Sequence, residues 1–413
     1  MSRLEELIQQ LCPDGVEYKE LGAVSSISRG GSFQKKDFVQ TGFPCIHYGQ
    51  IYTKYNLFVK NAISYITADV AEKQKRAVTG DIVMAVTSEN IEDVCRCVAW
   101  LGDGEIAVSG HAAIIHHTLE PKYLVYYLSS SLFFQQKLKL VQGTKVIEVS
   151  PEKLKRVKIP IPPLEVQQEI VRILDQFTEL TAELTAELTS RKKQYAYYRD
   201  KLLTFTDEVP LATLGDVALV TKLAGFEFTK YVRYSDSGNM IALRGLNVKN
   251  GKLDLTDVKY IDNSDFSKLT RSKLHIGDML FTYVGTIGQV ALIDEEDKFY
   301  LAPNVALIRS VDDKLSPQYM RYYFQSSNFW KTQINKLMQS SSMQNIPMEK
   351  IRKFTIPLPP LDEQHRIVSI LDRFDTLSND LTSGLPAEIE ARQKQYEYYR
   401  DKLLAFPELR EQR

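Results

Sequence analysis

The chain has 413 residues, and its 52 Lys and Arg residues are balanced by 52 Asp and Glu residues, giving a formal net charge of zero. This length has room for two to three domains, and the neutral charge weighs against nucleic-acid binding without excluding basic side chains gathered on one face. No apolar run approaches the roughly 20 residues of a membrane span, and the start, Met1-Ser-Arg-Leu-Glu-Glu, lacks the apolar core of a signal peptide. We therefore expect a cytoplasmic protein without a membrane partner.

The first globular stretch holds a pair of cysteines, Cys95 and Cys97, that alternate as one face of a buried strand would. A zinc site could recruit His111, His116 and His117, but the usual paired-cysteine spacing is missing. We interpret the cysteines as buried thiols and predict no metal site.

Two stretches, about residues 16–150 and 209–346, show the pattern of mixed helix and sheet. Short β-branched runs bounded by glycine predict strands at 82–86, 112–115, 290–293 and 305–308. Tyrosine-rich segments predict helices at 122–138 and 318–337. Each stretch is therefore expected to be an α+β domain.

Residues 170–202 carry a heptad seam of steps of four and three, in which Thr181 and Arg191 are the only polar members. The helix should begin just after Pro162-Pro163, because proline is tolerated in the first turn and not later. If it continues to Phe205, it spans roughly 60 Å.

A second seam, from Ile367 to Leu403, contains an extra step of four between Leu385 and Ile389. The extra step coincides with Ser383-Gly-Leu-Pro386, a stop and restart signal, so we expect a kink or break there. The two seams should pack on each other, antiparallel, as a spine; the alternative is that each packs on its own globular domain. The seam residues assigned to the spine and to subunit docking are Leu174, Phe177, Leu184, Leu188, Tyr195, Tyr198, Leu202, Leu371, Phe374, Leu381, Tyr396, Tyr399 and Leu403.

The two halves of the chain are copies of one another. Ile159-Pro-Ile-Pro-Pro-Leu164 recurs as Ile356-Pro-Leu-Pro-Pro-Leu361, and Tyr197-Tyr-Arg-Asp-Lys-Leu-Leu203 recurs at Tyr398. A period near 200 residues is too long for a solenoid. It predicts two homologous α/β domains separated by two long helices in an antiparallel coiled coil, with internal pseudo-twofold symmetry. The expected boundaries are 1–150, 151–208, 209–346 and 347–413.

The globular stretches align at Gly80-Asp81 with Gly277-Asp278 and at Tyr48-Gly49 with Arg244-Gly245. No phosphate-binding loop, dinucleotide fingerprint, nucleophile elbow or zinc-protease motif occurs, and the Asn-Pro-Pro-aromatic signature of adenine methyltransferases is missing. The sequence therefore predicts a chain that is not an enzyme by itself and binds no cofactor.

The chain resembles, over its whole length, the specificity subunit of a type I restriction–modification enzyme. The resemblance lies in the duplicated unit of proline motif, helix and Tyr-Tyr-Arg-Asp-Lys-Leu-Leu sequence. The tandem Thr181-Ala-Glu-Leu and Thr185-Ala-Glu-Leu repeat resembles the subfamily called type IC. The resemblance implies that each globular domain is a target recognition domain reading one half of a bipartite, asymmetric site in double-stranded DNA. It also implies that the helices set the spacing and dock two methyltransferase subunits carrying S-adenosylmethionine. Restriction–translocase subunits would use ATP and Mg²⁺.

Candidate DNA-binding residues are the polar side chains in loops laced with aromatic residues, because base edges are read by polar groups and phosphates by cations. For each of them the alternative is an ordinary solvated loop side chain. In the first domain they are Arg29, Gln34, Lys35, Lys36, His47, Tyr48, Gln50, Lys54, Ser88, Asn90, Thr144 and Lys145. In the second they are Lys222, Lys230, Arg233, Arg244, Asn247, Lys249, Tyr283, Thr286, Ser341, Gln344 and Asn345.

Two other classes of function stay open from the sequence. One is a coiled-coil scaffold or adaptor that reads no DNA. The other is the specificity half of a fused methyltransferase, whose catalytic signature would lie on a contiguous upstream segment.

Overall fold

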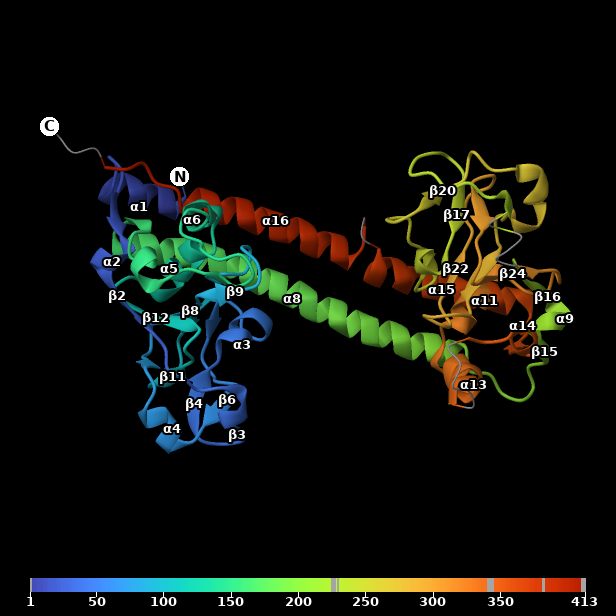
Figure 1. Ribbon diagram of the computed structural model, residues 1–413, viewed down its shortest axis with the longest axis horizontal. Coiled ribbons are helices and arrows are strands. Elements are labelled where there is room, and N and C mark those ends of the chain that lie inside the picture. The colour runs from blue at the N-terminus through green and yellow to red at the C-terminus, as the bar shows by residue number, and fades with distance from the viewer. Residues whose placement is uncertain (1, 224–227, 229, 340–344, 381–382, 410–413) are drawn as a thin grey trace. The chain divides into compact units, whose positions relative to one another are not determined.

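A computed structural model describes residues 2–223, 228, 230–339, 345–380 and 383–409. The chain forms two compact units (Figure 1). Unit 1 comprises residues 1–184 and 389–413, and unit 2 comprises residues 185–388. Each unit therefore combines one globular domain with helical segments from both copies of the repeat. Within the described residues, no helix is long and apolar enough to cross a bilayer.

Unit 1 contains two five-stranded sheets, and the central strand of the first is fully buried. The first has the order β2 (Ser25–Arg29), β12 (Ala112–His117), β8 (Ile82–Ala85), β10 (Cys97–Trp100) and β5 (Phe58–Val59). The second has the order β3 (Phe38–Val39), β6 (Ser64–Ile66), β4 (Phe43–Ile46), β11 (Ile106–Val108) and β7 (Arg76–Ala77). Pairing is antiparallel except between β5 and β10 and between β4 and β11, which are parallel.

Unit 2 repeats this order with shorter sheets. One sheet runs β16 (Ala218–Lys222), β24 (Val305–Ser310), β21 (Met279–Thr282) and β22 (Val290–Leu292). The other runs β20 (Lys259–Tyr260), β17 (Ile241–Leu243) and β23 (Phe299–Leu301), and β17 and β23 are again parallel. The four predicted strands correspond to β8, β12, β22 and β24, and the two domains share one fold.

The tyrosine-rich helices are interrupted, contrary to the single helices expected over 122–138 and 318–337. In unit 1, α5 (Pro121–Leu128) ends before α6 (Ser131–Lys137), because Ser130 Oγ accepts from the Phe133 N–H and starts a new helix. In unit 2, α11 (Pro317–Phe324) is followed by α12 (Ser327–Phe329), a π-helical turn over Trp330–Ile334 and α13 (Asn335–Gln339). Ser326 Oγ accepts from the Phe329 N–H in the same way. A serine N-cap satisfies the free N–H groups of a new first turn.

The long helices begin where the prolines predict. They are α8 (Leu164–Leu202), α15 (Leu361–Asn379) and α16 (Leu385–Leu403). The second copy is broken between α15 and α16, as expected, and Pro386 lies in the first turn of α16. A side chain at Gly384 would collide with the Thr376 carbonyl oxygen, so this position requires glycine. Leu381 lies outside the described residues.

Both expectations for the seams hold in part. The core of unit 1 contains Leu174 from the start of α8 and also Tyr396 and Leu404 from the end of the second copy. The core of unit 2 contains Leu371 from α15 and Leu203 from the end of the first copy. The start of each seam therefore packs on its own domain, and its end packs on the other domain. In unit 1 the start of α8 runs antiparallel to the end of α16 (Figure 1).

Polar contacts recur in both units at equivalent positions. Tyr126 Oη donates to Asp175 at 2.6 Å, and Tyr322 Oη donates to Asp372 at 2.5 Å. The buried amide of Gln167 accepts from the Glu120 N–H and donates to the Pro162 carbonyl, both within unit 1. Gln364 does the same in unit 2, with the Ser316 N–H and the Pro359 carbonyl. These bonds satisfy buried polar groups where each helix meets its domain.

The cysteine prediction needs one correction. Cys97 begins β10, but Cys95 precedes the strand in a left-handed conformation with φ of 69°, so the two do not alternate on one strand. Both are nevertheless buried free thiols, and burial raises the pKa of each to about 12. In the described residues no group of three or more metal-ligating side chains gathers.

Candidate nucleic-acid interface

In unit 1 the candidate residues come from four separate segments, and the fold brings these segments together. Gly31, beside β2, bridges to Ser109, and Ser109 Oγ accepts from the Tyr48 N–H at 2.8 Å. Strand β9 (Thr87–Ser88) pairs with β13 (Ile147–Glu148), and Arg29 forms a 2.5 Å ion pair with Glu148. Residues 29–36, 47–54, 87–90, 109–111 and 142–148 thus form one continuous surface, here called the unit 1 rim.

Most candidates on the unit 1 rim are exposed, in particular Gln34, Lys35, Lys36, Lys54, Asn90, Thr144 and Lys145. Tyr48 and Ser88 are half-buried. Two candidates hold the fold instead. His47 is 8 % exposed and caps α3 (Tyr48–Thr53) by accepting from the Gly49 N–H at Nδ1. Gln50 accepts from the His47 N–H and donates to Ser64 Oγ, so both ends of its amide are engaged.

The electrostatics of His47 follow from this position. Burial lowers the pKa of its imidazole, and the nearby Lys35 and His111 lower it further. The neutral form is the one that can accept at Nδ1. His47 is therefore an uncharged cap under the rim, which replaces its predicted role as a base-reading residue.

Unit 2 has an equivalent surface, here called the unit 2 rim, formed by residues 222, 244–249, 283–286, 304 and 345. Lys222 Nζ lies 5.5 Å from the centre of the Tyr283 ring, and Val284 bridges to Asn345. Thr286 and Asn345 are exposed, whereas Tyr283 is 7 % exposed and acts as a platform under Lys222. Lys230 and Arg233 are exposed on the segment that follows β16, and Lys249 forms a 2.5 Å ion pair with Asp254. Ser341 and Gln344 lie outside the described residues.

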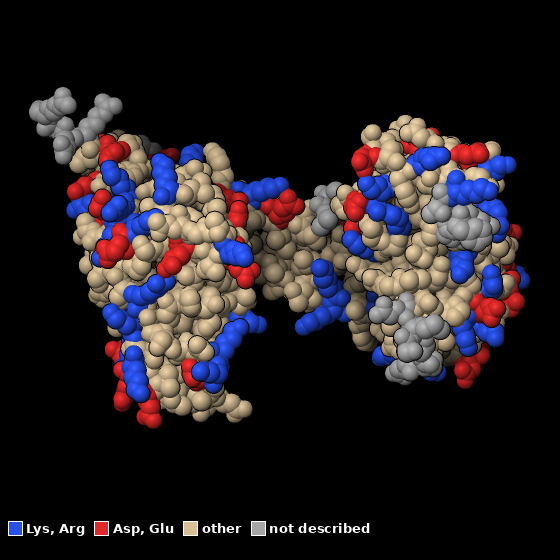
Figure 2. Space-filling model, in the orientation of Figure 1, with Lys and Arg blue, Asp and Glu red and all other residues tan. Residues whose placement is uncertain are grey.

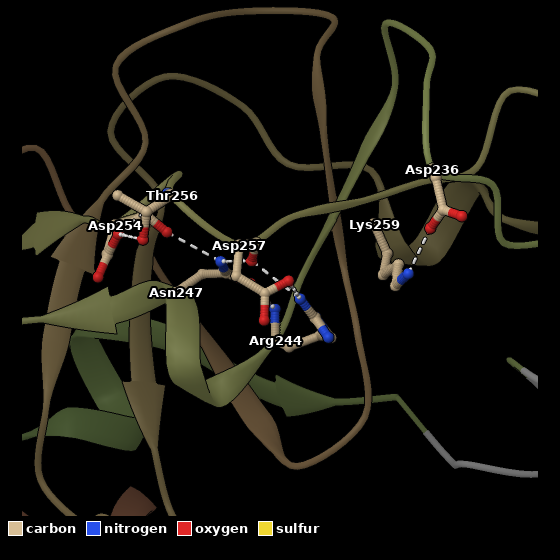
Figure 3. A network of polar contacts seen from close by, with 7 residues as sticks. All are labelled: Asp236, Arg244, Asn247, Asp254, Thr256, Asp257 and Lys259. Atoms are coloured by element: carbon tan, nitrogen blue, oxygen red, sulfur yellow. Dashed lines mark hydrogen bonds and ion pairs between the residues drawn. The ribbon is translucent and has the colours of Figure 1, made fainter. Parts of the chain in front are cut away.

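Arg244 and Asn247 form the centre of a polar network (Figure 3). Arg244 Nη2 donates to Oδ1 of Asp257 at 2.9 Å and to its carbonyl at 2.8 Å. Asn247 has no exposed surface; its Oδ1 accepts from the Arg244 N–H, and its Nδ2 donates to the carbonyls of Asp254 and Asp257. Asn247 therefore cannot reach a base, and Arg244 cannot make a two-pronged contact with guanine without breaking its pair with Asp257. Asn247 is corrected to a structural role, and DNA binding by Arg244 stays a prediction.

The network also corrects the alignment of the two domains. His47 follows β4 and its N–H donates to the side chain of Gln50, just as Arg244 follows β17 and its N–H donates to the side chain of Asn247. His47, not Tyr48, therefore occupies the position in unit 1 that Arg244 occupies in unit 2. The sequence alignment is shifted by one residue here, because it matched the glycines of the two turns.

The helices carry a second duplicated surface. Tyr198 stacks on Phe374 within unit 2, and Tyr399 stacks on Phe177 within unit 1. The neighbouring Tyr197 and Tyr398 are 62 % and 61 % exposed, with Lys201 and Lys402 beside their rings. Leu184 and Leu188 are half-buried. On the face shown in Figure 2, basic and acidic side chains are interspersed in both units, in keeping with the neutral net charge.

The chain carries one fold twice, in two domains with equivalent strand orders. Residues 13–191 and 207–391 each match the family described as the type I restriction modification DNA specificity domain, and the chain belongs to this family. It is a specificity subunit without catalytic activity of its own, and the catalytic activities of these systems lie in other subunits.

The relatives agree with this family. A putative type I restriction enzyme specificity subunit of Haemophilus influenzae is 34% identical over 315 residues, covering 73% of this chain and 77% of that protein. The EcoR124I/EcoR124II specificity subunit of Escherichia coli is 36% identical over 271 residues, covering 61% of this chain and 64% of that protein. A type I system structure described for its complex assembly and conformational transition has the same fold, with a TM-score of 0.62, 17% identity and coverage of 95% and 98%.

Proposed function

We propose that this subunit recognises a bipartite, asymmetric sequence in double-stranded DNA, with one half-site contacted by each rim. The observation that carries this proposal is that one strand order presents two rims of different chemistry. Unit 1 exposes polar side chains such as Gln34, Lys36 and Asn90, whereas unit 2 exposes Lys222, Thr286 and Asn345. Different polar groups on the same scaffold would select different bases.

The helices are proposed to fix the spacing between half-sites and to dock two methyltransferase subunits. The support is the duplicated pair of exposed rings, Tyr197 and Tyr398, since tyrosine is enriched at protein interfaces. S-adenosylmethionine would be bound by the methyltransferase subunits, and ATP and Mg²⁺ by restriction–translocase subunits. The assembled complex would work in the cytoplasm.

The experiment that tests this function is methylome sequencing of DNA from a host that expresses the subunit with its methyltransferase. The expected result is one methylated motif with two defined halves and an undefined spacer. Replacing residues 209–346 with the corresponding domain of a relative should change one half and leave the other. A motif in which both halves change would contradict the assignment of one half-site to each unit.

A scaffold without DNA recognition predicts a different outcome. In that case the purified methyltransferase complex would retard all DNA sequences equally, with or without this subunit. Retardation of motif-containing DNA only when the subunit is present supports the proposed function.

A further inference from the structure

His111 lies in the unit 1 rim, although the sequence analysis considered this residue only as a metal ligand. It lies in the turn between β11 and β12 and is exposed. Its Nδ1 is 3.1 Å from Thr87 Oγ1, and its ring centre is 4.9 Å from that of Tyr48. Its carbonyl oxygen accepts from the Val86 N–H at 3.0 Å. Two other rim segments therefore contact the imidazole, and the backbone bond to Val86 fixes the residue that carries it.

The support around His111 is itself rigid. Thr87 is buried, and its carbonyl oxygen accepts from Tyr52 Oη at 2.7 Å. Tyr48 is anchored through its N–H to Ser109 Oγ, and its ring lies 4.6 Å from that of His47. Because Nδ1 is engaged by Thr87, Nε2 is the one polar atom of the ring left for an outside partner. A fixed, exposed polar group costs little ordering free energy when it binds.

The same position in unit 2 is occupied by Asn304. His111 is the last residue before β12 and Asn304 the last before β24, and the two strands have the same place in their sheets. Asn304 is exposed and has φ of 70°, a left-handed conformation that asparagine tolerates better than most residues. Both domains thus expose a side chain that can hydrogen-bond to a base edge at this position, a histidine in unit 1 and an asparagine in unit 2.

We propose that His111 contacts a base edge in the first half-site and determines the base accepted at one position, with Asn304 in the equivalent place for the second half-site. The inference rests on the proposed function. A donor at Nε2 would select an acceptor in the major groove, such as N7 or O6 of guanine, and an acceptor at Nε2 would select the amino group of adenine or cytosine.

Two variants distinguish the proposed base contact at Nε2 from the contact of Nδ1 with Thr87. His111→Asn keeps a polar group near Thr87 and removes the group at Nε2, while His111→Gln keeps a polar group at the reach of Nε2 and removes the one near Thr87. The matched control is His116→Asn, the same change on β12, the strand that follows His111, where Nδ1 pairs with Asp81 outside the rim.

The measurement is the methylated motif of each variant, expressed with the methyltransferase. We expect His111→Asn to relax one position of the first half-site, with about fivefold or more loss of discrimination, as for one lost hydrogen bond. His111→Gln should keep part of that discrimination, and His116→Asn should keep the parental motif. The second half-site should be unchanged in all three and reports that the subunit is folded.

Three outcomes would overturn the inference. The first is an unchanged first half-site in His111→Asn beside a bipartite parental motif, which leaves the proposed function intact. The second is loss of both half-sites in His111→Asn, which makes His111 a folding residue. The third is the same relaxation in His116→Asn. The absence of any bipartite motif from the parental protein would instead reject the proposed function.

Discussion

The ring of Phe177 stacks on the ring of Tyr399, with centres 5.5 Å apart and planes inclined by 25°. Tyr198 and Phe374 repeat this pair at 5.5 Å and 23°, with the two copies exchanged. In each unit the phenylalanine comes from the helix that begins on that domain, and the tyrosine comes from the helix that ends on it. The two contacts are therefore equivalent: each joins the start of one helical copy to the end of the other within one unit.

We predict that the Phe177–Tyr399 pair stabilises unit 1 beyond the area it buries. A double-mutant cycle of Phe177→Leu and Tyr399→Leu should give a coupling free energy of about 1 kcal/mol, as for other aromatic pairs. Hydrogen exchange resolved along the chain should place the loss of protection in unit 1. Tyr398→Leu is the control, because this ring is exposed and should change the free energy of unfolding by less than about 0.5 kcal/mol.

Asp200 should stabilise unit 2 as a helix cap. Its Oδ1 accepts from the Ser327 N–H at 2.9 Å, at the start of α12. Asp200→Ala should therefore cost about 1 kcal/mol of unfolding free energy, localised by hydrogen exchange to residues near 327. Asp207→Ala, at an exposed carboxylate, should have little effect. Equal effects of both substitutions would contradict the capping role.

The pKa of Asp200 gives that contribution a pH dependence. Burial alone would raise the pKa, but hydrogen bonds from Ser327 and the nearby Arg199 outweigh burial and hold the pKa below the usual value of 3.8. A depressed pKa in the folded state means that the stabilisation is present above about pH 4 and is lost as the pH falls through the folded value. The difference between the parental protein and Asp200→Ala should accordingly shrink in acid.

Unit 1 should lose stability on mild acidification through His47. The pKa of His47 is lowered by burial below the usual 6.5, so the unfolded chain binds its proton first and stability falls as the pH drops below about 7. Protonation at Nδ1 would also remove the acceptor for the Gly49 N–H. His47→Asn keeps a capping oxygen that does not titrate. Thermal unfolding between pH 7.5 and 5 should show a smaller loss for this variant than for the parental protein.

Lys36→Ala should weaken DNA binding evenly across sequences. Lys36 is exposed on the unit 1 rim, and a lysine that contacts a phosphate contributes affinity but no base preference. The slope of the logarithm of affinity against the logarithm of salt concentration should fall by about one unit. A changed methylation motif in this variant would show that Lys36 contacts a base instead.

Adding one Thr-Ala-Glu-Leu after Leu188 should lengthen the spacer of the recognised site by one base pair. Four residues add about 6 Å and a net turn near 40°, and one base pair adds about 3.4 Å and about 35°. We give the rotation priority, since a rotated domain loses its groove, whereas a few ångströms can be absorbed by bending the DNA. The boundary between the units falls between Leu184 and Thr185, inside the existing repeat. An unchanged spacer in the methylated motif would show that this helix does not measure it.

Much of the fold could be predicted because it is encoded locally and twice. The prolines before Leu164 and Leu361 fix the helix starts, and Gly384 with Pro386 fixes the break. The interruption after α5 was missed because Ser129-Ser130 sits within a pattern of apolar residues that favours one helix. The exchange of seam ends between domains was missed because a heptad pattern shows which face is apolar and not which partner covers it.

The sequence predicted which segments form the candidate site but not the role of each side chain in them. Loop composition identified the segments that meet in the rims, but side-chain roles depended on contacts between residues far apart in the sequence. Asn247 is buried because the carbonyls of Asp254 and Asp257 converge on its amide, and no local pattern reveals this. The place of His111 beside Thr87 and Tyr48 could not be predicted either, because these neighbours are distant in the chain.

One repeated stretch of sequence contributes to the hydrophobic core of both units. Residues 197–203 and 398–404 are identical, Tyr-Tyr-Arg-Asp-Lys-Leu-Leu, and each supplies the leucine that completes the core of a globular domain from the other half of the chain. Because the two stretches are identical, a globular domain moved to the other position would meet the same residues there. With one half-site recognised by each unit, as proposed above, an exchange of domains would change the half-sites and leave these helix contacts in place.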